Sequence, residues 1–367
     1  MSQFETMLGR MPVRTWSRPR VNDAGLVLRE PDDVSLAGGA DIRASGQIII
    51  KQSYDRTAFG EDLTGPFVPE GLRVFIEENT NRRHLIRIPK GYAEREPIVL
   101  TLHLGMESPV LVDDVVIEAE EDASAVVILK YTSDDGTRVQ HFGRTRVIVR
   151  RNARVQLVKL QMLPNDAAHT DAVGGVAQAG ARLDVILAEL GAARPLSSCN
   201  LILEGDGANA ELDVVYLGDG ERSLDMSYRA EHRGRKTVSG IYAKGILMDR
   251  SKKIFRDTLD FKSGASGSKG REEENVLMLG RDVRNISVPL LLCGEDNVEG
   301  EHAASSGRPD EKVLFYLMSR GLGELEAKKL LAQAAVSSIV EKIPEASVRN
   351  EILGAVRRSI GKGGAKA

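Results

Sequence analysis

The chain has 367 residues, 42% of them hydrophobic, and a formal net charge of −3, so no charge excess points to nucleic acid or an anionic membrane as a partner. Its two cysteines exclude a disulfide framework, and its beginning lacks the apolar core of a signal peptide. No apolar run approaches the roughly 18 residues of a membrane span, so we expect a cytoplasmic protein without a membrane partner.

The first part of the chain differs in texture from the rest. Residues 1–45 mix Gly, Pro and Asp with short apolar stretches, and we expect a loosely ordered lead-in there. From residue 46 onward, short runs rich in Val, Ile and Leu recur between turn-forming residues, which is typical of strands. These runs lie at 48–50, 72–76, 98–104, 110–117, 126–129, 147–149 and 155–160. No helical segment of about 12 residues separates them, which argues against a doubly wound sheet.

An internal repeat sharpens this prediction. A residue that tolerates the left-handed backbone region is followed by Ala and then by alternating apolar residues at four places, beginning at Asp122, Asn152, Gly180 and Gly207. The spacings are 30, 28 and 27 residues. A turn of constant geometry followed by a half-buried strand is what a solenoid needs, so we expect a right-handed parallel β-helix over residues 46–306. An antiparallel sandwich with similar turns remains the alternative.

The pattern becomes helical near Pro309, which we place at the start of a first helix, and Gly321 is a natural stop. Residues 324–342 and 347–360 predict two further helices, the former with Ala327 and Leu330 among the apolar residues of one face. We therefore expect a small helical domain over 307–361 and a disordered tail over 362–367.

Few motifs in the chain carry chemistry. The glycine-rich stretch 264–270 does not match the spacing of a phosphate-binding loop, so ATP hydrolysis by this chain is not expected. The histidines His84, His103, His141 and His169 are isolated in the sequence and suggest no metal site. The acid pairs 113–114 and 134–135 leave a polysaccharide-active β-helix enzyme as an alternative function, although aromatic residues for sugar stacking make up only 4% of the chain.

Several segments between residues 225 and 343 resemble the SufB and SufD family of iron–sulfur cluster assembly proteins. They read Y-R-A-E-H at 228–232, T-V-S-G at 237–240, K-G-I-L-M-D at 244–249 and E-D-N-V-E-G-E-H-A-A-S at 295–305. The most specific is D-E-K-V-L-F-Y-L-M-S-R-G at 310–321, which is similar to a helix of that family. The β-helix expected before these segments is consistent with the resemblance.

The resemblance implies a non-catalytic subunit of the SUF iron–sulfur cluster assembly system. Its β-helix would pair with a SufB-like chain or with a second copy of itself, and its helical domain would bind a SufC-like ABC ATPase. The ATPase, driven by ATP, would then expose an assembly site at the β-helix interface. The docking residues implied by the helix motif are Asp310, Leu314, Phe315, Leu317 and Arg320.

The resemblance also implies a cluster-assembly interface. His302 aligns with the family histidine at that interface, and Glu301 lies beside it. Cys293 is the remaining candidate thiolate, although its apolar run predicts a buried strand. His302 and Cys293 are therefore the candidate metal ligands, for an iron–sulfur cluster held transiently and shared with a partner chain.

The chain departs from the SufB pattern at three positions. Gly300 stands where the family often has cysteine, Glu274 stands where SufB carries its scaffold cysteine, and Ala303 replaces an acid. With these differences the chain resembles the SufD type more than SufB, or a divergent single-gene form. Cys199 has no supporting motif.

Overall fold

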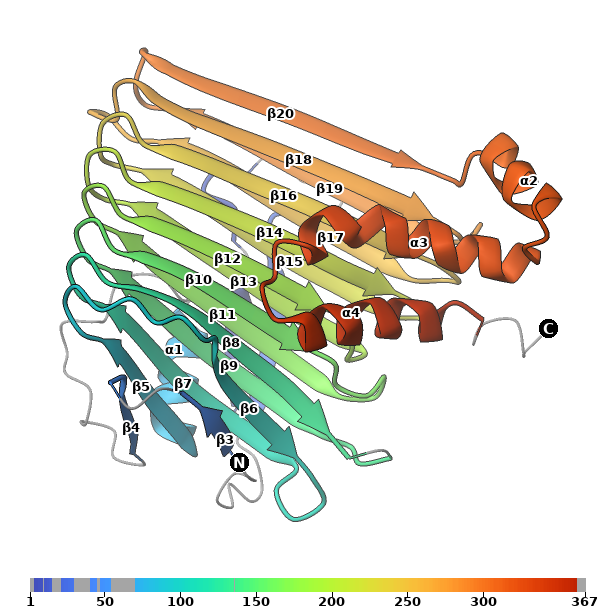
Figure 1. Ribbon diagram of the computed structural model, residues 1–367, viewed down its shortest axis with the longest axis horizontal. Coiled ribbons are helices and arrows are strands. Elements are labelled where there is room, and N and C mark those ends of the chain that lie inside the picture. The colour runs from blue at the N-terminus through green and yellow to red at the C-terminus, as the bar shows by residue number, and fades with distance from the viewer. Residues whose placement is uncertain are drawn as a thin grey trace.

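The computed structural model describes residues 3–8, 10–14, 21–29, 40–44, 47–53, 70–134 and 136–361. In these residues the chain winds as a β-solenoid between two nine-stranded sheets, and each turn adds one strand to each sheet (Figure 1). Sheet I contains β3 (Ala40–Arg43), β6 (Ile98–Leu104), β8 (Ser124–Ser133), β10 (Arg154–Gln161), β12 (Arg182–Glu189), β14 (Asn209–Gly218), β16 (Val238–Leu247), β18 (Ser268–Met278) and β20 (Val298–Gly307). Sheet II contains β4 (Ile49–Ser53), β5 (Arg82–Ile88), β7 (Val110–Ala119), β9 (Gln140–Val149), β11 (Ala168–Ala177), β13 (Arg194–Leu203), β15 (Ser223–His232), β17 (Lys252–Phe261) and β19 (Arg284–Cys293).

The repeat seen in the sequence is the corner that leads into each strand of sheet I. Asp122, Asn152, Gly180 and Gly207 all have φ between 56° and 68°. Each donates its backbone N–H to a carbonyl one turn later, as Asn152 does to Ala179 at 3.0 Å. The strands that come after these corners pair in parallel and in register, which confirms the solenoid and excludes the antiparallel sandwich.

The two ends of the solenoid are built differently. At the beginning, β3 pairs antiparallel with β6 and β4 pairs antiparallel with β5, so the first turn ends against reversed strands. At the other end, β19 and β20 are the last strands of their sheets, and no described strand pairs with their outer edges. We call this the open end. Almost every residue of β20 is exposed there, and the strand forms the upper rim in Figure 1.

The lead-in also contains β1 (Gln3–Leu8) and β2 (Ala24–Arg29), which pair with each other. The strand predicted over 72–76 is wrong, because this stretch belongs to helix α1 (Glu70–Asn79). Leu72, Phe75 and Ile76 are spaced by three and one residues, which is the period of one helical face. Together they pack on Val110, Val112, Phe142 and Ala172 of sheet II.

Three helices close the chain: α2 (Glu311–Ser319), α3 (Glu324–Val340) and α4 (Ala346–Ser359). α3 and α4 lie across the outer face of sheet I (Figure 1), where Val336 and Ile352 share one apolar cluster with strand residues such as Ile186. The apolar face of α3 is only partly covered by sheet I, because Leu330 is 45% exposed while Ala332 is buried. Among the described residues, no helix is long and apolar enough to span a membrane. The predicted tail 362–367 lies outside the described residues.

Candidate functional site

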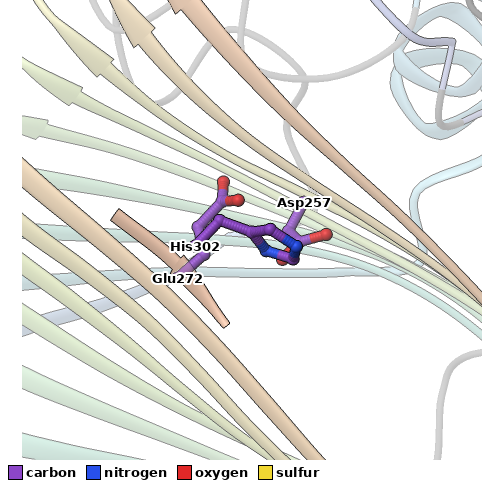
Figure 2. Close-up of side chains that lie close together, drawn as sticks. All are labelled: Asp257, Glu272 and His302. Atoms are coloured by element: carbon purple, nitrogen blue, oxygen red, sulfur yellow. The ribbon is translucent and has the colours of Figure 1, made fainter. Parts of the chain in front are cut away.

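Three ionisable side chains converge at the open end. His302 of β20 lies opposite Glu272 of β18 in the parallel register, and both point into the solenoid. Asp257 reaches the same place from β17 of sheet II (Figure 2). One possible ligand atom from each of the three lies within 4.8 Å of the others. Asp257 and Glu272 are buried, whereas His302 is exposed because no further turn covers it.

The two buried carboxyl groups have few hydrogen-bond partners. Within the described part of the chain, both oxygens of Glu272 and one of Asp257 are buried without a hydrogen bond of ordinary geometry, although the Leu259 backbone N–H lies close enough to Glu272 to lower its pKa. Burial raises the pKa of Glu272, and the charge of Asp257 raises it further. Burial also raises the pKa of Asp257, with Glu274 as the second cause. Such a pair is stable when it holds a proton or a cation.

The structure does not bring the other two predicted interface residues into this group. Glu301 follows the alternation of a strand and points to the opposite face of sheet I, where it lies 3.5 Å from Arg271. Cys293 is the last residue of β19, on the same sheet face as buried Phe261 of β17. The prediction of a buried Cys293 is wrong, because the solenoid ends here and leaves the thiol exposed.

The five residues predicted to dock an ATPase all lie on or beside α2. Asp310 caps the helix by accepting a hydrogen bond from the Lys312 backbone N–H at 2.8 Å. No residue of α2 is buried, and Phe315 is 73% exposed while Leu314 and Leu317 are half-buried. Arg320 lies over the ring of Tyr316. α2 thus presents apolar side chains to solvent at the edge of the molecule (Figure 1).

The acid pairs do not form an open catalytic pair in the described residues. Asp113 points into the solenoid, where it bonds to His141 at 2.6 Å, whereas Asp114 points outward to Arg144 at 2.7 Å. Asp134 is exposed and bonds to His103, and residue 135 lies outside the described residues. Two carboxyls on opposite faces of one sheet cannot flank a single glycosidic bond.

A family model described as the SufBD core domain of SUF system FeS cluster assembly matches residues 103–335. The chain belongs to this SufBD family. Its relatives include the iron-sulfur cluster assembly protein SufD of Bacillus subtilis, 26% identical over 303 residues that cover 80% of this chain and 69% of that protein. SufBD family proteins of Staphylococcus saprophyticus and Staphylococcus epidermidis are each 24% identical over 261 residues, 71% of this chain. The chain spans 56% of the length of these two staphylococcal proteins.

The interior of this SufBD-family solenoid carries a line of buried polar groups that sequence reasoning missed. His141 and His169, which look isolated in the sequence, face each other with their Nδ1 atoms 2.8 Å apart. Lys159 pairs with Asp171 at 2.6 Å in the same region. The available signal was the repeat, since His169 follows His141 by 28 residues and pairs with it in register.

The same signal points to the group at the open end, because Glu272 precedes its register partner His302 by one turn. Glu274, which stands where SufB carries its scaffold cysteine, also points inward. It forms a buried ion pair with Lys253 at 2.5 Å.

Proposed function

We propose that this SufBD-family chain is a non-catalytic scaffold subunit of a SUF iron–sulfur cluster assembly complex. In that complex it pairs through its solenoid with a SufB-like chain or a second copy of itself, and it binds a SufC-like ABC ATPase through α2. The observation that carries the proposal is the exposed apolar surface of α2. The two other closing helices pack part of their apolar faces on sheet I, whereas no residue of α2 is buried, so α2 carries most of the exposed large apolar side chains of the region 307–361.

Pairing through the open end is supported by the strand edges of β19 and β20. A parallel sheet edge without a neighbouring strand offers backbone donors and acceptors to another chain, whereas the first turn is closed by reversed strands. Apolar residues such as Leu291, which is 39% exposed, add a contact surface there.

The cargo in this proposal is an iron–sulfur cluster held for a short time. Burial raises the pKa of the Cys199 thiol far above its ordinary value, so it is a poor ligand, and Cys293 is left as the one exposed thiol. Clusters are commonly held by four thiolates, so the remaining ligands would come from the paired chain.

Co-purification with a SufC-like ATPase tests the docking surface. We expect Phe315→Glu alone to weaken the complex, and the combined change of Leu314, Phe315 and Leu317 to Glu to abolish it, because charge is placed in an apolar interface. Leu330→Glu on α3 is the matched control, since this leucine is also exposed but lies outside α2. Undiminished co-purification of the triple variant would reject the docking surface. Molecular mass measured by light scattering, with and without a SufB-like chain, separates the two modes of pairing.

A further inference from the structure

We propose that Asp257, Glu272 and His302 form a binding site for a single divalent first-row transition-metal ion within this one chain. The proposal deepens the function above, because its biological role as an iron-loading point rests on that function. The site itself requires no partner residue. It places the metal-binding chemistry of this chain on two interior carboxylates, which no motif in the sequence had indicated.

The geometry supports one ion held by three ligands. The three ligand atoms lie within 4.8 Å of one another, and two ligands of a metal with bonds of about 2.0–2.2 Å are at most about 4.4 Å apart, so any adjustment needed is small. The adjustment can come from His302, because its strand is the last of sheet I and its side chain is exposed. Glu272 and Asp257 are held by buried strands of the two sheets, so the ion would bridge the sheets at the open end (Figure 2).

The second observation is the state of the carboxyl oxygens. Both oxygens of Glu272 and one of Asp257 are buried without a hydrogen bond of ordinary geometry among the described residues, and the Leu259 backbone N–H offers Glu272 partial compensation. Buried polar atoms in native proteins are almost always satisfied, so poorly satisfied carboxyl oxygens that converge on one place favour a cation as their partner. Glu274, which also faces the interior, differs because Lys253 and Tyr216 satisfy it.

The donor set selects the class of ion. Two carboxylates and a neutral imidazole carry a charge of −2, which matches a divalent cation. Imidazole suits Fe²⁺, Co²⁺ and Zn²⁺, whereas Mg²⁺ prefers oxygen ligands alone. Three protein ligands leave coordination positions open toward the solvent side, where His302 lies.

The test uses the full chain without a histidine tag, under anaerobic conditions, with Co²⁺ as the spectroscopic probe and Fe²⁺ and Mg²⁺ in parallel. We expect one equivalent of Co²⁺ and of Fe²⁺ by equilibrium dialysis, visible absorption bands for bound Co²⁺, and no binding of Mg²⁺ at the same concentration. Glu272→Gln and His302→Ala should each weaken Co²⁺ binding at least tenfold. Glu301→Gln is the matched control, since it neighbours His302 on the same strand but points to the opposite face.

Three results would overturn the site: no Co²⁺ bound by folded chain, equal binding by the His302→Ala variant, or an equal loss in Glu301→Gln. Circular dichroism confirms that each variant is folded. ATPase co-purification is measured on the same proteins, because retention of the ATPase without metal binding rejects the site and leaves the proposed function standing. A chain that binds the metal but does not retain the ATPase rejects the docking surface and leaves the metal site standing.

Discussion

The buried ion pair between Lys253 and Glu274 should decide much of the stability at the open end. Lys253 is fully buried and Glu274 is 3% exposed, and the carboxylate also accepts a hydrogen bond from Tyr216 at 2.8 Å. Lys253→Met removes the cation and leaves a buried carboxylate, which typically costs about 3–5 kcal/mol. The carboxylate can lose its charge by taking up a proton. At pH 7 this costs about 3–4 kcal/mol for a glutamate with an ordinary pKa near 4.3, so we expect a loss of about 3–4 kcal/mol.

Urea unfolding followed by circular dichroism measures this loss, with Lys252→Met as the matched control because Lys252 is the exposed neighbour. Protonation of an uncompensated buried carboxylate costs less at lower pH, so the deficit should shrink as the pH falls from 7 toward 4.3. Adding Glu274→Leu should recover most of the stability, since neither charge of the pair remains. A Lys253→Met variant within 1 kcal/mol of the Lys252→Met control, or a deficit that does not change with pH, would refute the reasoning.

Two further predictions concern a corner and a histidine. Asn152 has φ 56°, a left-handed conformation that glycine tolerates and valine does not. Asn152→Gly should therefore change the unfolding free energy by a few tenths of a kcal/mol, and Asn152→Val should lower it by about 1–2 kcal/mol. Equal effects of the two substitutions would contradict the corner geometry. Burial lowers the pKa of His232 from 6.5 to about 4, so between these pH values the unfolded chain binds a proton at this histidine and the folded chain does not. Stability should be retained above pH 6.5 and fall by up to about 3 kcal/mol toward pH 4. The His232→Gln variant should lose less stability toward pH 4 than the exposed-site variant His103→Gln. If the dependence of the unfolding free energy on pH, measured by urea unfolding, is the same in both variants, the prediction is wrong.

Local chemistry explains which predictions from the sequence succeeded. The corners at Asp122, Asn152, Gly180 and Gly207 need a left-handed backbone, which few residue types tolerate, so their repeat already specifies a solenoid. The closing helices could be predicted equally well, because caps and apolar periodicity are properties of a short segment. The prediction of a strand at 72–76 was wrong because a short apolar run does not distinguish a strand from a helix.

The kind of fold and the family could therefore be inferred from the order of residues alone, whereas the meeting of particular side chains could not. Asp257 and His302 are 45 residues apart and come from different sheets, so their convergence depends on strand register and on where the last turn stops. The exposure of Cys293 and the free surface of α2 have the same origin, because burial depends on which neighbouring element is present, and that is a property of the assembled chain.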